Sequence, residues 1–306
     1  MSDSILPAVI DRLRDRGATA GVTVEQITIG RSTLMVELAG VDGGADDEGC
    51  EKRRTAGLAH RPPGDAPPTA NSDLETLLEW TTQPPADSLL EPAGQTHPES
   101  EDTALEVAIG IATVNALSAP FIEWQTGDPM ALLDSRVDTI ATVGLFRPAF
   151  RKFSDVDVRV IERKPIGDVS TPDSVTVTTY RPADAAAAMA DAEVVFITGS
   201  TLIYGGLERY LETAPETATV VLIGATASVL PEAVFAAGVT VVAGASVTDP
   251  DQVRDAIQAN ACGTELHAAG VEKGYTVTDS PTGRGRRLHL SRADSPDRDE
   301  PRDDRL

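Results

Sequence analysis

The sequence predicts an α/β protein in which a doubly wound parallel sheet follows a smaller α+β domain. From Thr139 onward, short runs rich in Val and Ile alternate with helical stretches, which is typical of parallel strands joined by right-handed crossovers. Each run is apolar throughout, as strands covered on both faces require. A length of 306 residues fits about two domains of this kind.

The N-terminal domain is predicted to begin with a helix and a hairpin. Apolar residues recur at helical spacing between Ser4 and Arg16. Residues 22–29 and 32–38 then alternate apolar and polar side chains around Gly30, which predicts two antiparallel strands. One helix and one hairpin cannot close a core, so we expect the rest of this domain further along the chain.

Residues 42–103 form a Pro-rich, acidic insertion that we expect to be disordered. Within it, Gly57–Arg61 is a candidate short strand or site loop, and Leu74–Trp80 is a candidate helical turn. Ala104–Leu117 then has strong helical periodicity, and its Ala and Gly residues suit a close interface within the chain or in a homodimer. We therefore predict an N-terminal domain over residues 1–130, interrupted by the insertion.

The second domain is predicted over residues 131–278, and the Arg- and Asp-rich tail 279–306 is expected to be disordered. Its expected strands are Thr139–Val143, Val156–Ile161, Val194–Thr198, Thr219–Ile223 and Val239–Val242, with Val175–Thr179 as an extra short one. Its expected helices are Pro148–Phe153, Ala183–Ala190, Leu207–Thr213, Pro231–Ala236 and Pro250–Ala259.

The composition excludes several classes of protein. The formal charge is −22, and only four of the 26 basic residues are lysine, a pattern typical of salt-adapted, halophilic proteins. Such acidity argues against nucleic-acid binding, which needs clustered Lys and Arg. Cys50 and Cys262 suggest no disulfide framework, and we find no apolar segment of signal or membrane-span length. We therefore expect a cytoplasmic protein without a membrane partner.

Small and polar residues follow the expected strands. In a doubly wound sheet these strand ends line a crevice, where backbone amides and hydroxyl groups bind polar or anionic ligands. We therefore expect a small-molecule site there. The candidate ligand-binding residues are Gly144, Glu162, Thr198, Gly199, Ser200, Thr201, Gly224, Thr226 and Gly244.

Glu162 lies 18 residues beyond Gly144, where dinucleotide-binding folds place an acid that accepts a ribose hydroxyl. The second and third glycines of that fingerprint are absent after Gly144, however, which argues against NAD. Glu162 has a structural alternative as the ion-pair partner of Arg163 or Lys164.

The hydroxyl and imidazole groups give no complete catalytic set. Ser200 and Thr201 lack a G-x-S-x-G elbow and an evident His partner, so ligand contact or helix capping suits them better than nucleophilic attack. His60, beside Arg61, is the one histidine in a candidate site loop, and an ordinary surface position is its alternative. No Cys and His spacing fits a metal site.

Five blocks of sequence carry a resemblance to a known family. They are Ala108–Leu117, Val143–Phe146, Val160–Arg163, Thr198–Ile203 and Leu207–Glu208. Together they resemble an uncharacterised family described as putative heavy-metal chelation, in which an enolase-N-terminal-like domain precedes a Rossmann-like one. The resemblance covers about residues 3–40 and 104–275. It implies an interdomain cleft for a small ligand, such as a metal-chelating compound or cofactor precursor, with Asn115 at the junction to orient it.

The chain departs from the family pattern at Tyr204, Gly206 and Ala225, all near the expected ligand edge. Two alternative functions stay open. One is an enzyme for a small anionic substrate, with a divalent metal held by Glu162 and a second carboxylate. The other is a non-catalytic interaction protein that uses the acidic insertion. The sequence identifies neither the ligand nor a reaction.

Overall fold

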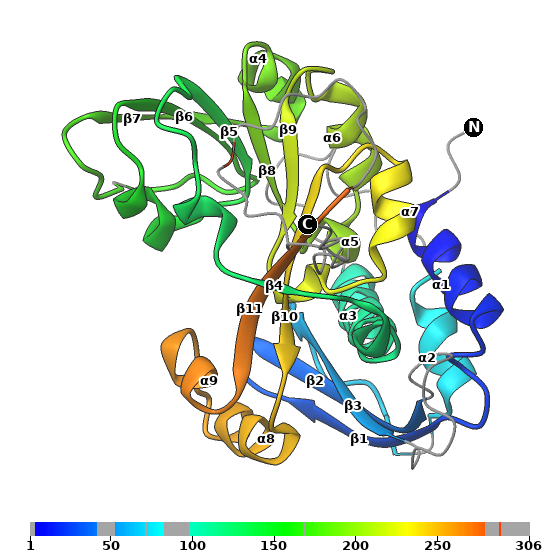
Figure 1. The fold of residues 1–306 in the computed structure, drawn as a ribbon. Helices are drawn as coiled ribbons and strands as arrows, with labels where there is room; N and C mark the ends of the chain where they lie inside the picture. Colours follow the sequence, from blue (N-terminus) through cyan, green and yellow to red (C-terminus); the bar gives the residue numbers. More distant parts are fainter. Residues whose placement is uncertain are drawn as a thin grey trace, which may run out of the picture.

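The computed structural model describes residues 4–41, 53–70, 72–82, 98–167, 169–278 and 288. These residues form an eight-stranded mixed sheet and a three-stranded antiparallel sheet, connected through the long helix α3 (Figure 1). The predicted α/β class is therefore confirmed. The tail 279–306, apart from Leu288, and the parts of the insertion at 42–52, 71 and 83–97 lie outside the described residues.

The large sheet has the strand order β4-β11-β10-β9-β8-β5-β6-β7. The six neighbouring strands β10, β9, β8, β5, β6 and β7 pair in parallel. Strand β11 pairs antiparallel with both β10 and β4. The strands are β4 (Gln125–Thr126), β5 (Thr139–Val143), β6 (Val156–Ile161), β7 (Val175–Tyr180), β8 (Val194–Thr198), β9 (Thr219–Ile223), β10 (Val241–Val247) and β11 (Val271–Val277).

The chain winds outward from β5 through β6 to β7, then returns to β8 and winds the other way through β9 and β10. The strand order thus reverses between β5 and β8, which is the topological switch point where ligands bind in open α/β sheets. The apolar runs led to the correct strands. The fifth run, expected over residues 239–242, instead begins at Val241 and continues to Val247.

Helices connect these strands largely as expected. They are α4 (Ala185–Met189), α5 (Thr201–Tyr204), α6 (Leu207–Thr213), α7 (Pro231–Ala236), α8 (Pro250–Gln258) and α9 (Thr264–Ala268). Of these, α6 and α7 have the expected bounds, and α4 and α8 are slightly shorter than expected. The helix expected over Pro148–Phe153 is instead a 3-10 turn, η3 (Arg147–Lys152). A second 3-10 turn, η5 (Ala225–Ala227), follows β9.

The small sheet has the order β1-β2-β3, formed by Thr23–Ile29, Thr33–Val41 and Arg53–His60. The helices of this part of the molecule are α1 (Ile5–Asp15), α2 (Leu74–Trp80) and α3 (Pro98–Ser118). The expectation of one disordered insertion over residues 42–103 is therefore wrong for β3, α2 and the start of α3, whereas the candidate helical turn Leu74–Trp80 coincides with α2 and the candidate strand Gly57–Arg61 overlaps β3. An acidic, Gly-rich stretch of sequence precedes β3 and a Pro-rich stretch follows it, but the residues of β3 pair fully with β2 and supply the third strand that the hairpin needed.

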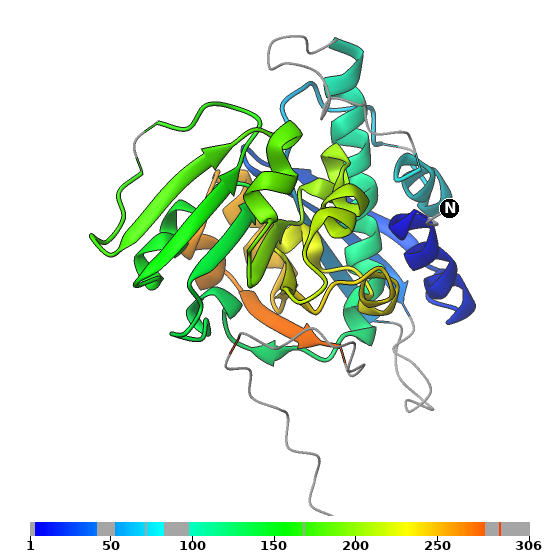
Figure 2. The same cartoon turned by 90° about the horizontal axis from the view of Figure 1, so that it is seen from above.

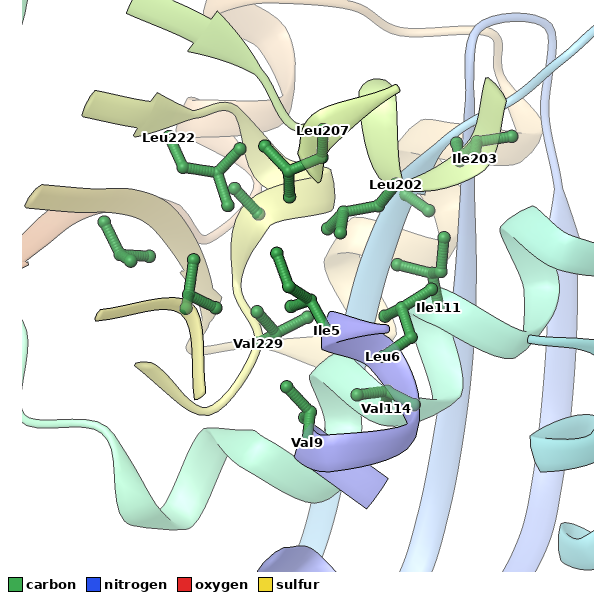
Figure 3. Close-up of a cluster of buried hydrophobic side chains, with 14 of the residues drawn as sticks. Ile5, Leu6, Val9, Ile111, Val114, Leu202, Ile203, Leu207, Leu222 and Val229 are labelled. Atoms are coloured by element: carbon green, nitrogen blue, oxygen red, sulfur yellow. The ribbon is translucent and has the colours of Figure 1, made fainter. Parts of the chain in front are cut away.

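Helix α3 connects the two sheets. It packs on β2 and β3 and also contacts α5 and η5, while α1 and α2 lie on its side away from β5 to β7 (Figure 2). Apolar side chains of α1, α3 and α5 meet here, among them Leu6, Ile111 and Leu202 (Figure 3). Gly57 lets β3 approach α3 so closely that a Cβ atom would clash with the Ala112 carbonyl oxygen.

One expectation about membranes needs correction. Thr103–Phe121 is long and apolar enough to cross a membrane by length and composition, although we expected no such segment. In the structure, 72% of its most apolar window is buried. A helix that is apolar on all sides and packed on all sides is typical of the core of a soluble protein.

Candidate functional site

At the switch point, where a crevice was predicted, Gly144 follows β5 and Thr198 ends β8. Gly144 has a φ of +96°, a conformation that favours glycine. A Cβ atom there would lie 3.1 Å from Cγ2 of Thr198, so the turns after β5 and β8 are in contact. The two ends are half-buried and adjacent, as the sequence predicted.

The turn after β8 divides the predicted hydroxyl groups into two kinds. Thr201 is buried, and its Oγ1 donates to the Thr198 carbonyl oxygen at 2.8 Å, which closes the turn into α5. Ser200 is half-buried, and its backbone nitrogen donates to Oγ1 of Thr198 at 3.3 Å. The structure therefore gives Thr201 a structural contact and leaves Thr198 and Ser200 partly exposed at the edge.

The turns after β8 and β9 also touch. A Cβ atom on Gly199 would lie 2.7 Å from the Ala227 backbone nitrogen, so only glycine permits this approach. Thr226 is buried, and its Oγ1 accepts a hydrogen bond from the His60 backbone nitrogen at 2.9 Å. Through Thr226, the end of β9 is tied to the end of β3 in the small sheet.

Asn115 is buried at the same junction. Its Nδ2 faces the carbonyl oxygens of Leu58 at 2.8 Å and of Ala225 and Thr226 at 3.3 Å. Its Oδ1 has no hydrogen-bond partner among the described residues. Asn115 thus links α3, β3 and η5, a position in agreement with the expected junction, and its contact with a ligand stays a prediction.

Glu162 lies further along the edge, half-buried at the end of β6. Its Oε1 accepts from the backbone nitrogen of Arg163 at 2.9 Å. The Arg163 guanidinium lies 4.2 Å from the ring centroid of Tyr204, and the His60 ring lies 6.2 Å from that of Tyr204. Desolvation lowers the pKa of His60, and the charge of Arg163 lowers it further.

A cavity of about 400 Å³ opens beside these turns and is largely apolar. This volume is in the range of small-molecule sites. Three strand ends, the small sheet and α9 contribute to its wall. Its lining includes Leu58, Met130, Phe146, Gly224, Ala225, Ala243, Gly244, Ala245, Leu266 and His267.

Of the predicted residues, Gly224 and Gly244 line this cavity, whereas Gly144, Glu162, Thr198, Gly199, Ser200, Thr201, Thr226 and Asn115 lie outside its lining. Gly244 also permits a second contact. A Cβ atom on Gly244 would lie 2.6 Å from Cη2 of Trp124, whose indole packs across β10 and β11. Gly244 therefore stands between the cavity and Trp124.

Charged groups at the cavity were missed by sequence reasoning. The Asp128 Oδ2 atom is 2.6 Å from Nζ of Lys152 and 3.4 Å from Nζ of Lys273. Burial alone would raise the pKa of Asp128, but the hydrogen bond and charge of Lys152, with the charge of Lys273, lower it overall. Nδ1 of His267 donates to the Val271 carbonyl oxygen at 2.6 Å.

Among the described residues, no three His, Cys, Asp or Glu side chains come together as a metal-binding group. Cys262 is a free, exposed thiol, and Cys50 lies outside the described residues. Glu162, the one metal ligand named from the sequence, lies at the strand-end turns. Metal binding by Glu162 and by a second carboxylate stays a prediction.

Comparison with known proteins agrees with this architecture. Residues 128–275 match the DUF364 family, described as putative heavy-metal chelation. An uncharacterized protein of Methanocaldococcus jannaschii is 28% identical over 182 residues, which cover 56% of this chain and 66% of that protein. The chain thus spans just under two thirds of the length of this relative.

Two solved DUF364 proteins of unknown function have the same fold. The one from Pyrococcus horikoshii superposes with a TM-score of 0.67 at 16% identity, covering 90% of this chain and 100% of that one. The one from Desulfitobacterium hafniense gives a TM-score of 0.63 at 16% identity, covering 90% and 98%. The DUF364 match spans β5 to β10 and both cavity lysines.

Proposed function

We propose that this protein binds a small polar or anionic molecule between the carboxyl edge of the large sheet and the small antiparallel sheet. A metal-chelating compound or a cofactor precursor is the class of ligand that the DUF364 description favours. The observation that carries the proposal is the cavity of about 400 Å³ lined by Gly224 and Gly244, next to the switch point.

The chemistry of the edge supports a bound molecule over a metal held by the protein alone. The cavity offers apolar surface, backbone groups after β9 and within β10, two lysines and His267. These groups suit an organic ligand, which can itself carry a metal. On this view, chelation is done by the small molecule, and the protein recognises the chelate or its precursor.

Three finer properties belong to the same proposal. We propose that the small sheet with α1 to α3 is the enolase-N-terminal-like domain of the family, and that residues 131–278 are its Rossmann-like domain. The acidic composition supports a protein that functions in a cytoplasm of high salt concentration. The enzymatic alternative keeps the same location, with Glu162 as its expected metal ligand.

Thermal unfolding tests the binding proposal. Wild-type protein is screened in high salt with divalent metals, chelators, metal–chelator complexes, pterins and nucleotides. A ligand at 100 times its Kd stabilises the folded state by about 2.7 kcal/mol, which raises Tm by several degrees. Ala245→Phe fills the cavity and should remove this shift.

The matched control is Ala187→Phe, which places the same side chain on an exposed position of α4. It should keep the ligand-induced shift of the wild type. If none of the compounds stabilises the wild type, the proposal is wrong. A shift that survives Ala245→Phe and disappears in Glu162→Ala would contradict the cavity as the site and place the ligand at the strand-end turns.

A further inference from the structure

The cavity brings together two of the four lysines of the sequence. Lys152 ends η3 and Lys273 lies in β11, so 120 residues separate them along the chain. Both ammonium groups nevertheless approach one oxygen, Oδ2 of Asp128. The other basic residues of the chain are mostly arginine, and it is the fold that brings these two lysines together.

Lys152, Lys273 and Asp128 together carry more positive than negative charge. Two ammonium groups face one carboxylate, and the other Asp128 oxygen accepts from the Met130 backbone nitrogen at 3.1 Å. Lys152 and Lys273 are 38% and 54% exposed, so both retain ammonium hydrogens that can bind a further acceptor. The group therefore offers a cationic rim to an otherwise acidic protein.

The wall next to this rim is apolar. Met130, Leu145 and Phe146 line it together with Gly224 after β9 and Gly244 in the middle of β10. Apolar walls favour a ligand that gives up little hydration, whereas the lysines favour an acceptor with negative charge. Together, the apolar wall and the lysines favour an apolar molecule that carries an anionic group.

We propose that the cavity takes a compact apolar molecule whose anionic group, a carboxylate, sulfonate or phosphate, is bound by Lys152 and Lys273. This inference rests on the proposed binding function and names the chemistry of its ligand. Asp128 occupies the lysines when the cavity is empty and competes with the incoming anion.

A pair of fluorescent probes separates the apolar from the anionic part. 1-Anilinonaphthalene-8-sulfonate carries one sulfonate, and N-phenyl-1-naphthylamine has the same rings without it. Wild-type protein should bind the sulfonate more tightly than the neutral amine. Lys152→Gln and Lys273→Gln should each weaken sulfonate binding by about tenfold and leave the amine unchanged, because a hydrogen bond to a charged group is lost.

Two further variants give the matched controls. Lys164→Gln removes the same charge from a lysine outside the cavity lining and should leave both affinities unchanged. Asp128→Asn removes the competing carboxylate, keeps an oxygen for the Met130 backbone nitrogen, and should tighten sulfonate binding. Near-ultraviolet circular dichroism verifies that every variant is folded, and Ala245→Phe should abolish the binding of both probes.

The outcomes distinguish this inference from the proposed function. Equal binding of both probes, or equal loss in Lys164→Gln and Lys152→Gln, overturns the anionic preference while the cavity remains a binding site. If neither probe binds but a compound of the thermal screen stabilises the wild type, this inference alone fails. If neither probe nor any compound binds, both proposals fail.

Discussion

Two buried polar residues join the small sheet to the rest of the molecule, and their surroundings differ. At the ionic joint, Glu37 of β2 is fully buried between Arg54 of β3 and Arg254 of α8, which it contacts at 2.7 and 2.6 Å. Arg254 also donates through Nε to the second Glu37 oxygen at 2.8 Å. At the amide joint, Asn115 uses its Nδ2 on three carbonyl oxygens while its Oδ1 has no partner among the described residues.

The difference indicates which joint fixes the small sheet and which lies at the site. The ionic joint has charged partners on both carboxylate oxygens and does not belong to the cavity lining. The amide joint contacts Leu58 and Ala225, which both line the cavity. A ligand in the proposed cavity would therefore contact two hydrogen-bond partners of Asn115 and none of those of Glu37.

The largest expected effect comes from Glu37→Gln. The substitution weakens three charge-assisted hydrogen bonds of the buried carboxylate, although Arg54 and Arg254 both keep Asp251 as a partner. We expect a loss of about 3 kcal/mol in the free energy of unfolding. Chemical denaturation measures it. The control is Glu75→Gln, which breaks the Arg14–Glu75 pair whose side chains are 47% and 59% exposed and should cost below about 1 kcal/mol. Equal losses would mean that burial adds nothing to the ionic joint.

An intermediate effect is expected for Asn115→Ala. The substitution leaves the buried carbonyl oxygens of Leu58, Ala225 and Thr226 without their shared donor, at a cost of about 2 kcal/mol. Amide hydrogen exchange should rise in β3 and η5 and remain unchanged in α8. Increased exchange in α8 would show that the two joints are not independent.

The smallest effect concerns pH. The pKa of His60 is lowered in the folded state, so the unfolded chain binds more protons below about pH 6.5. The contribution of neutral His60 to stability is therefore complete above pH 6.5 and declines as the pH falls toward its lowered pKa. His60→Gln should flatten this part of the stability curve relative to the wild type. Identical curves from pH 5 to pH 8 would contradict this role.

Sequence reasoning reached the parallel strands because each is an unbroken apolar run, as Val194–Thr198 is. It missed β11, whose adjacent charged residues and central glycine do not resemble the buried parallel strands. It assigned β3 to an insertion because the neighbouring composition is Pro-rich, although pairing with β2 stabilises this strand. These errors share a cause, since tertiary pairing overrides local composition.

For the site, the small residues after β5, β8 and β9 were sufficient to predict turns at one edge. The roles of those residues depended on partners that no local pattern reveals. Thr226 binds the end of β3, and Gly199 permits contact with η5. The charged group at residues 128, 152 and 273 joins three distant segments, so the spacing of charges in the sequence could not disclose it.

The packing of Trp124 on Gly244 has an optical consequence. The sequence has two tryptophans, and Trp124 is separated from the cavity by a single glycine-containing strand. Indole emission depends on the polarity and field around the ring, so filling the cavity would alter the spectrum of Trp124. Trp80 on α2 supplies a constant background. The protein thus carries an intrinsic reporter of its own occupancy, which allows unlabelled compounds to be titrated directly.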